Sequence, residues 1–335
     1  MISFKCISTA EDLPYQWDEL AQCYFQQTEF LLHIQKFNSC KQRYYLCYDD
    51  EMLVSCAIVY TLQIDMLTFV KVKSPLKMHI VGVPCSVSSS GIFGNKDAVV
   101  LLKEHIYQKE KGFMLSLNLE DKPESKAFAS GNTLPTIKLT NRFKNWDEYI
   151  SSLRSGYRRR LIQAYKKNED LYFSKLNCAE FNREMHQQYL NVYKRSSGKL
   201  EKLTLDFFKN LPPAFKLTVC LKKDKIIGWN IGLEDKGIYY FFLGGVDYSQ
   251  NKTDNTYFQL LMHVVKDGIE SKVQTIELGQ TAEIPKMRMG GIPQPLYMEA
   301  HHSQKGINYL IKICSPLLEY KRVFEKTNAL KEANS

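Results

Sequence analysis

This sequence lacks the patterns that mark common metal, nucleotide and redox sites. It has neither a GxGxxG nor a GxxxxGK[ST] run, which excludes the Rossmann and P-loop fingerprints. Its nine cysteines form no CxxC pair, and its seven histidines form no HExxH motif. The adjacent His301 and His302 have no third ligand at a suitable spacing. We therefore expect no metal site and no permanently bound cofactor.

Long apolar runs are missing as well. No stretch approaches the roughly 20 residues of a membrane-spanning helix, and the N-terminal MISFKCISTAEDLP has no apolar signal core. The cysteine count is odd, and cysteines such as Cys56 and Cys220 lie inside apolar runs, as small core residues do in a reducing compartment. We therefore expect a soluble, cytoplasmic protein without a membrane span.

What the chain does have is enough length for two domains and a modest excess of positive charge. Its 335 residues suit two domains of about 150 residues each. The 45 basic and 36 acidic residues leave a net charge of +9, which favours anionic partners such as a nucleotide, CoA or RNA. A solvated, Lys-rich surface explains the same excess, so charge alone does not indicate nucleic-acid binding.

The two halves of the chain predict the same order of elements. Residues 1–140 predict a helix at 17–37, a hairpin of strands at 43–50 and 52–64, a strand at 77–85, a helix at 98–108 and a strand at 112–120. Residues 171–326 predict helices at 182–195 and 203–212, a meander at 215–250, a polar loop at 251–255, a helix at 256–271 and a strand at 273–280. The residues themselves do not repeat, so the repeat is topological. The predicted fold class is α/β, with an α+β mixed sheet in each of two tandem domains.

A basic helical linker, residues 141–170, joins the two predicted domains. It predicts two short helices that separate near Ser155 and Gly156. Its basic residues are Arg154, Arg158, Arg159, Arg160, Lys166 and Lys167. The spacing of Tyr157, Leu161, Ile162 and Tyr165 predicts an apolar face, so the two tyrosines fit core packing better than base stacking. Three interpretations stay open: a solvated helix, a helix whose Arg158 and Lys166 bind donor phosphates, and an RNA footprint.

The polar loop at 251–255 stands before a predicted helix, where a phosphate can bind. A helix N-terminus offers unpaired N–H groups and a partial positive charge. Gly244 and Gly245 end the preceding strand and allow close approach of a ligand. An ordinary capped helix gives the same pattern, because Asn, Thr and Asp are good N-cap residues.

Three residues are candidates for chemistry around this loop. Carboxylate, phenol and amine side chains can move a proton or stabilise a developing negative charge. Asp247 and Tyr248 directly follow the strand end, where such groups could act. Lys286 follows the last strand, where it can bind a substrate carboxylate or steady an oxyanion. A turn, side-chain packing or a surface charge are the alternative explanations of the same residues.

The chain resembles the GNAT (acyl-CoA N-acyltransferase) superfamily in its tandem form, and more narrowly the Fem-type and BioF-like acyltransferases. The resemblance is carried by three stretches: NWDEYISSLRSGYRRRLIQAYKKN, KDKIIGWNIGLEDKGIYYFFLGGVDYSQNKT and IELGQTAEIPKMRMGG. It covers residues 145–300 by motif and the first domain by element order. The usual pyrophosphate loop, R/Q-x-x-G-x-G/A, is replaced here by QNKTDN.

The resemblance implies an enzyme that transfers an acyl group from acyl-CoA to an amine by direct attack. It implies donor binding by Gly244, Gly245, Asn251, Lys252, Thr253, Asn255 and Arg158, and catalysis by Asp247, Tyr248 and Lys286. The acceptor would be a small molecule or a precursor that bears an amine. Two alternatives stay open: an aminoacyl-tRNA donor with a cell-wall precursor as acceptor, and a GNAT-like protein that binds without catalysis.

Overall fold

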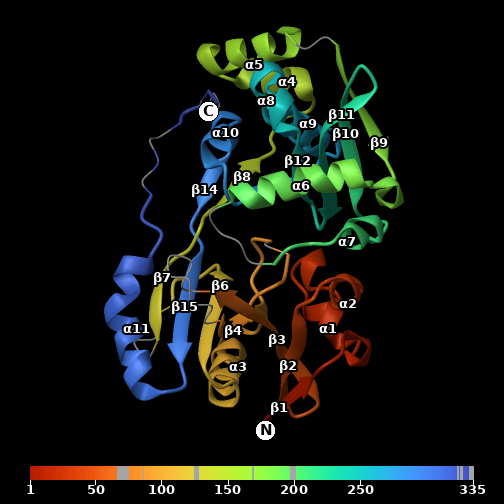
Figure 1. Ribbon diagram of the computed structural model, residues 1–335. Helices are drawn as coiled ribbons and strands as arrows, with labels where there is room; N and C mark the ends of the chain where they lie inside the picture. Colours follow the sequence, from red (N-terminus) through yellow and green to blue (C-terminus); the bar gives the residue numbers. More distant parts are fainter. Residues whose placement is uncertain are drawn as a thin grey trace. The chain divides into compact units, whose positions relative to one another are not determined.

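The chain folds into two compact units, which are described separately below. The computed structural model describes residues 1–65, 75–85, 87–123, 128–167, 170–196, 201–322, 324 and 327–331 (Figure 1). The first unit contains Met1–Leu134 and Pro295–Arg322, and the second contains Pro135–Gln294 and Val323–Ser335. Each unit therefore takes its residues from two separate segments of the chain.

The first unit is built on a mixed sheet of eight strands within the described residues. Along the hydrogen-bonded path the order is β1 (Ile2–Ile7), β2 (Lys41–Asp49), β3 (Met52–Asp65), β4 (Pro75–Val81), β6 (Phe113–Leu119), β15 (Tyr297–His302) and β7 (Ala129–Asn132). The short β5 (Ile92–Gly94) pairs with β3. β4 and β6 run parallel, and the helix α3 (Lys96–Lys109) connects them. A helix is needed there because parallel neighbours require a crossover connection.

The helix predicted over residues 17–37 is interrupted. The structure has α1 (Gln16–Leu20), a single 3-10 turn at Tyr24–Gln26, and α2 (Thr28–Phe37). Gln26 explains the break, since its carbonyl accepts from Trp17 Nε1 at 2.8 Å and its Oε1 accepts from the Gln22 amide at 2.7 Å. These bonds satisfy backbone groups outside a helix, so the prediction of one continuous helix was wrong.

The second unit is built on a mixed sheet of seven strands within the described residues. Its order is β14 (Ile292–Gln294), β8 (Thr136–Thr140), β13 (Thr275–Gly279), β12 (Ile238–Val246), β11 (Lys225–Asp235), β10 (Lys216–Lys222) and β9 (Leu171–Leu176). β12 and β13 run parallel, and α9 (Thr256–Glu270) makes the crossover. The remaining helices are α4 (Trp146–Ser152), α5 (Ser155–Lys167), α6 (Arg183–Arg195), α7 (Leu205–Lys209), α8 (Tyr248–Asp254) and α10 (Glu283–Arg288).

The two sheets follow one plan, as the topological repeat predicted. In both units a strand and two helices lead into a three-strand meander, then a helix and a parallel strand. The first unit therefore places β1 to β4, α3 and β6 where the second places β9 to β12, α9 and β13. The fold is α/β with a mixed sheet in each unit, as expected from the sequence.

The last strands of the two units are exchanged between the halves of the chain. β8 follows β7 in sequence but lies in the second sheet, and β15 follows β14 but pairs with β6 and β7 in the first sheet. The helix α11 (Lys305–Leu318) comes after β15 and lies beside β7 and β15 (Figure 1). These long-range pairings explain why the compact units differ from the predicted partition into 1–140, a linker at 141–170, and 171–326.

Helix α9 packs closely onto the second sheet. Its buried face includes Leu261, Val264 and Val265, which belong to the main apolar cluster of this unit. Burying side chains of this size stabilises a fold by about 1.5–3 kcal/mol each. Gly268 allows the approach, because a Cβ there would lie 2.6 Å from Ile276 Cγ1 on β13. The helix that opens at Thr256 is thereby held against the two parallel strands.

Candidate functional site

The parallel strands β12 and β13 separate partway along their length. They pair only at Ile238 with Thr275, Tyr239 with Ile276 and Tyr240 with Glu277. The rest of β12, residues 241–246, pairs with β11 alone. Its pairing with β11 also shifts between Ile231 and Gly232, so that Phe242 is an extra residue on β12. A bulge bends a strand and disturbs its ladder. The pairing of β12 with β13 therefore ends after Tyr240, and the place where the two strands part is hereafter called the strand gap.

Lys286 lies at the edge of the strand gap. Its Nζ donates to Gly279 O at 3.1 Å and to Gln280 O at 2.6 Å, at the end of β13. A Cβ on Gly279 would stand 3.6 Å from Phe241 O and 4.0 Å from Lys286 Nζ. Phe241 is the first residue of β12 beyond the last pair with β13. The amine therefore sits where the two strands part, and it binds two carbonyl groups at the end of β13.

The environment of Lys286 favours its neutral form. The side chain is 3% exposed, and burial lowers the pKa of its amine to about 7, against an opposing effect of Glu283 and Glu277. A neutral amine has two hydrogens, which match the two carbonyl acceptors, and one lone pair. A group that titrates near neutral pH can both accept and donate a proton. Lys286 was selected from the sequence as a site residue, and that role stays a prediction.

The predicted polar loop at 251–255 is helical through Asp254, so that prediction was wrong. Asp247 starts helix α8, because its Oδ1 accepts from the Ser249 amide at 2.9 Å and from Ser249 Oγ at 2.6 Å. Asn251 lies within this helix, and its Oδ1 accepts from the Tyr257 amide at 2.9 Å. Asn255 then adopts a left-handed conformation with φ 51° and begins α9 without a side-chain cap. A short helix therefore stands where a phosphate-binding loop was expected.

Asp247 and Tyr248 have structural contacts of their own. Lys225 Nζ lies 3.0 Å from Asp247 Oδ2. Burial alone would raise the pKa of Asp247, but hydrogen bonds from Ser249 and Lys225 outweigh it, and the pKa is lowered. The Arg195 guanidinium lies 3.5 Å from the centre of the Tyr248 ring. These contacts account for both residues as parts of the fold, and their catalytic roles stay predictions.

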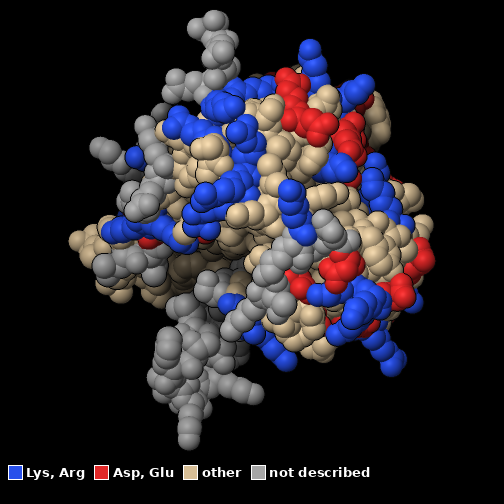
Figure 2. Space-filling view, turned by 90° about the horizontal axis from the view of Figure 1, so that it is seen from above, with Lys and Arg blue, Asp and Glu red and all other residues tan. Residues whose placement is uncertain are grey.

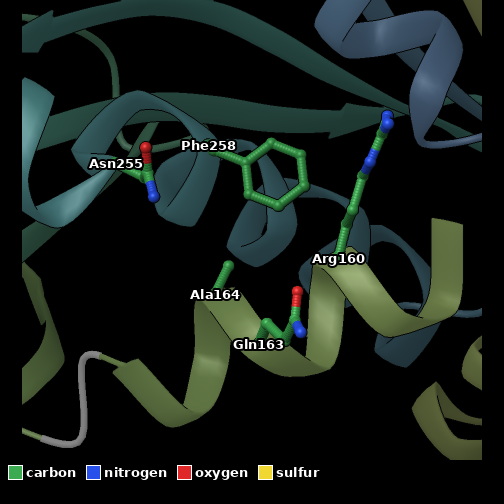
Figure 3. Close-up of a pocket in the computed structure, with 5 residues that line it drawn as sticks. All are labelled: Arg160, Gln163, Ala164, Asn255 and Phe258. Carbon is green, nitrogen blue, oxygen red and sulfur yellow. The ribbon is translucent and has the colours of Figure 1, made fainter. Parts of the chain in front are cut away.

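A hollow of about 390 Å³ lies between α5 and the start of α9. Arg160, Gln163 and Ala164 project into it from α5, and Asn255 and Phe258 face them from the α9 side (Figure 3). A helix N-terminus and a guanidinium on one hollow are suited to an anionic group. Of the residues expected to bind the donor, Asn255 lines this hollow. Arg158 does not line it, whereas Arg160, two residues further along α5, does.

Gly244 and Gly245 lie on β12 beside the strand gap, as expected. Each glycine also makes room for a neighbouring side chain. A Cβ on Gly245 would lie 2.4 Å from Trp229 Nε1, and one on Gly244 would lie 3.2 Å from the Phe241 ring. Packing therefore explains these glycines without a ligand. The side chains of Lys252 and Thr253 lie outside the part of the chain that the structure describes.

Asn230 was not selected from the sequence, although it is an unusual residue for its position. It is 1% exposed on β11 and pairs with Gly244 across the ladder. Neither polar atom of its side chain has a hydrogen-bond partner among the described residues. A buried amide without partners is rare and requires an explanation. The signal was present in the apolar run IIGWNIGL, in which Asn230 is the one polar side chain.

The exposed face of α5 differs from the prediction. Leu161 is buried, but Ile162 and Tyr165 are 38% and 67% exposed, so they do not belong to an apolar packing face. Arg159, Arg160 and Lys166 are exposed on the same helix. Figure 2 looks down on this side and shows Lys and Arg side chains gathered there. The helix thus presents an aromatic ring among positive charges, which is suited to anionic ligands with planar groups.

The equivalent strands of the first unit do not part in this way. β4 pairs with β6 from Met78 to Val81, its last residue. No group of three or more His, Cys, Asp or Glu side chains suited to a metal occurs among the residues that the structure describes. Among those same residues, no helix is both long and apolar enough to cross a membrane. The strand gap of the second unit is therefore the strongest candidate site.

Comparison with known proteins agrees with this architecture. Residues 151–286 match the family model described as an acetyltransferase (GNAT) domain. No curated protein matches the chain. A conserved protein of unknown function from Bacteroides thetaiotaomicron VPI-5482 is similar in structure, with 12% identity and a TM-score of 0.53 over 90% of this chain and 99% of that one.

Two further solved structures show a similar arrangement. A tandem GNAT protein from the clavulanic acid biosynthesis pathway has 8% identity and a TM-score of 0.50, covering 91% of this chain and 99% of that one. FemX has 10% identity and a TM-score of 0.49, covering 84% and 92%. At these identities the likeness concerns the fold alone. For the tandem GNAT protein, this likeness is consistent with the two repeated sheets described above.

Proposed function

Because this chain has a tandem GNAT fold with a GNAT acetyltransferase domain at residues 151–286, we propose that it is an N-acyltransferase. The donor is an acyl-CoA and the acceptor is an amine, which attacks the thioester directly. The reaction takes place in the second unit, at the strand gap between β12 and β13. CoA is a co-substrate in this proposal, and no permanently bound cofactor takes part.

The observation that carries the proposal is the position of Lys286. Its amine is bonded to Gly279 O and Gln280 O, beyond the last pair of β12 with β13. In this proposal an extended amide-bearing arm, as a pantetheine is, binds along β12 beyond Tyr240 in the manner of an added strand. A thioester at the end of such an arm would come to rest near the Lys286 amine.

Lys286 can manage the proton that amide formation releases. The acceptor nitrogen forms a C–N bond with the thioester carbon, and the C–S bond breaks. The neutral Lys286 amine takes a proton from the attacking nitrogen, and the resulting ammonium returns it to the leaving thiolate. A pKa of about 7 makes both transfers feasible near neutral pH. No covalent enzyme intermediate forms.

The hollow between α5 and α9 accommodates the phosphates of the donor in this proposal. Arg160 supplies a guanidinium, and the start of α9 supplies the positive end of a helix dipole. The amide of Tyr257 is already bonded to Asn251, so fewer backbone donors are available here than at an uncapped helix start. The guanidinium therefore has a larger share of phosphate binding.

The proposal is tested by measuring thiol release from a series of acyl-CoAs of increasing chain length, with simple amines as acceptors. Thermal stabilisation by the same acyl-CoAs measures binding independently. Lys286→Met is expected to reduce turnover by about a hundredfold or more while binding persists, in the range of general acid–base catalysis. Arg288→Met is the matched control, because Arg288 is an exposed residue of the same helix α10. If no acyl-CoA stabilises the protein and none releases thiol in its presence, acyl-CoA is ruled out as the donor.

Aminoacyl-tRNA is the second candidate donor, and Tyr165 is the observation that favours it. This ring is 67% exposed on α5, next to Lys166. Base stacking on an aromatic ring contributes about 1–3 kcal/mol. Filter binding of charged tRNA at several salt concentrations tests the idea, since phosphate contacts make binding fall steeply with salt. If the affinity for charged tRNA changes neither with salt concentration nor in the variant Tyr165→Ala, tRNA is eliminated as the donor.

A further inference from the structure

The helix α11 of the first unit turns an apolar face outward. Ile307, Tyr309, Leu310 and Ile313 are 40%, 65%, 59% and 57% exposed, and Cys314 is also exposed. These side chains recur at intervals of three and four residues, which places them along one side of a helix. Isolated apolar side chains are common on protein surfaces, but a continuous apolar stripe indicates an interaction site.

The polar side of α11 holds the helix against the rest of its unit. Asn308 Oδ1 accepts from the His302 amide at 3.1 Å at the end of β15. Beyond the helix, Glu319 Oε1 accepts from the Asn132 amide at 3.1 Å, and the Tyr320 amide donates to Asn132 O at 3.0 Å. Hydrogen bonds to β7 and β15 therefore fix the orientation of α11, which lies beside these strands in Figure 1, and the side chains of the apolar stripe stay exposed.

The charged residues in the segment that contains the stripe are mostly basic. Four basic residues occur between residues 305 and 322, namely Lys305, Lys312, Lys321 and Arg322. Glu319 is the acidic residue of this segment, and it is bonded to Asn132. A helix with an apolar face and basic flanks is the arrangement that binds in the plane of an anionic membrane surface.

We propose that α11 docks this protein onto an anionic membrane surface. The stripe formed by Ile307, Tyr309, Leu310 and Ile313 enters the boundary between headgroups and acyl chains, and the lysines contact the lipid phosphates. A second copy of the chain fits this surface less well, because a two-fold contact would bring the basic residues of both copies together. One 14-residue helix face also offers less area than the roughly 800 Å² per partner of a stable dimer. This inference does not depend on the proposed acyl transfer.

The test is co-sedimentation of the full chain with vesicles. Vesicles of phosphatidylcholine with about one third phosphatidylglycerol carry the negative charge, and vesicles of phosphatidylcholine alone are the comparison. The wild-type chain is expected to bind the anionic vesicles, more weakly as salt increases. The double variant Leu310→Glu, Ile313→Glu is expected to bind roughly tenfold or more weakly, because two charges replace apolar contacts.

A matched control is available in the same unit. Val100 and Leu101 are 50% and 42% exposed on α3, which has the same length as α11, so the double variant Val100→Glu, Leu101→Glu should bind as the wild type does. The variant Lys305→Glu, Lys321→Glu leaves the stripe intact and should lose binding to anionic vesicles specifically. Thermal melts establish that each variant is folded.

Three outcomes would overturn the inference. The first is a wild-type chain that does not sediment with anionic vesicles at low salt. The second is a dimer in light scattering that Leu310→Glu, Ile313→Glu converts to a monomer, which would assign the stripe to a second copy of the chain. Equal loss of vesicle binding in the α3 control would likewise contradict a specific role of α11.

Discussion

The buried amine of Lys286 should make the stability of this protein depend on pH in a defined window. In the unfolded chain the amine keeps its ordinary pKa of 10.5, whereas burial lowers it to about 7 in the folded state. Between these two values the unfolded chain holds more protons than the folded one. The contribution of Lys286 to the free energy of unfolding therefore rises with pH between these two values and is constant below and above them.

The size of the effect follows from the shift. Each pKa unit corresponds to about 1.4 kcal/mol, so the full shift corresponds to about 5 kcal/mol between neutral pH and pH 10.5. The variant Lys286→Met removes the titrating group and also the two bonds to Gly279 O and Gln280 O. Loss of those bonds adds a cost of about 1–3 kcal/mol that does not vary with pH. The pKa is therefore obtained from how the difference in unfolding free energy between the two proteins changes with pH, and not from its constant part.

The assay is urea unfolding of the wild type and Lys286→Met at intervals from pH 6 to about pH 10, under reducing conditions. Other titrating groups cancel in the difference between the two proteins. The wild type should gain on the variant by about 1.4 kcal/mol per pH unit above pH 7. Arg288→Met, the exposed control on α10, should give a flat difference. A flat difference for Lys286→Met, within about 1 kcal/mol, would refute the lowered pKa and with it the proton-transfer role.

Three further predictions concern residues around the strand gap. Asn230→Leu should raise the stability of the ligand-free protein by about 1–3 kcal/mol, because it removes a buried amide without partners; a loss of stability in urea unfolding would show that the amide is paired. Gly268→Val should destabilise by about 1–3 kcal/mol, since even a Cβ would lie 2.6 Å from Ile276 Cγ1, and an unchanged unfolding midpoint would contradict the close packing of α9. In Arg160→Ala, the same thermal stabilisation should need about ten times more CoA, while the melting temperature of the free protein stays unchanged. Arg158→Ala should leave CoA binding unchanged, because Arg160 lines the hollow and Arg158 does not.

Local sequence predicted the meanders well because each turn has a local cause. The hairpin between β2 and β3 turns at Asp50 with φ 51°, and the turns at Asp224 and Gly237 have φ 63° and 76°. Asp and Gly tolerate this left-handed conformation, so apolar runs separated by such residues predict hairpins correctly. The order of elements, and from it the tandem fold, followed from these short-range signals.

The sequence was misleading where a residue can serve two structural purposes. Asn, Thr and Asp at 251–255 suggested a loop, but they continue a helix that Asp247 initiates. In a loop and in a helix alike, the side-chain oxygens of Asn, Thr and Asp can cap backbone amides, so the packing of neighbouring residues decides between the two structures. The pairing of β15 with β6 could not be predicted from the sequence either, because it joins residues that lie far apart along the chain.

The difference between the two sheets argues that chemistry belongs to the second unit. Both units have a lysine in a buried setting, but their surroundings differ. Lys103 Nζ lies 2.6 Å from the fully buried carboxylate of Glu299, which neutralises its charge inside a sheet whose parallel strands stay paired to the end of β4. Lys286 has carbonyl acceptors in place of a carboxylate at contact distance, and it stands where the parallel strands have parted. Lys103 is thus held in an ion pair, whereas the amine of Lys286 can release a proton near neutral pH. If one copy of a duplicated fold keeps an open and titratable site, a substitution at Lys103 should therefore lower stability and leave turnover per folded molecule unchanged, whereas Lys286→Met should lower turnover per folded molecule.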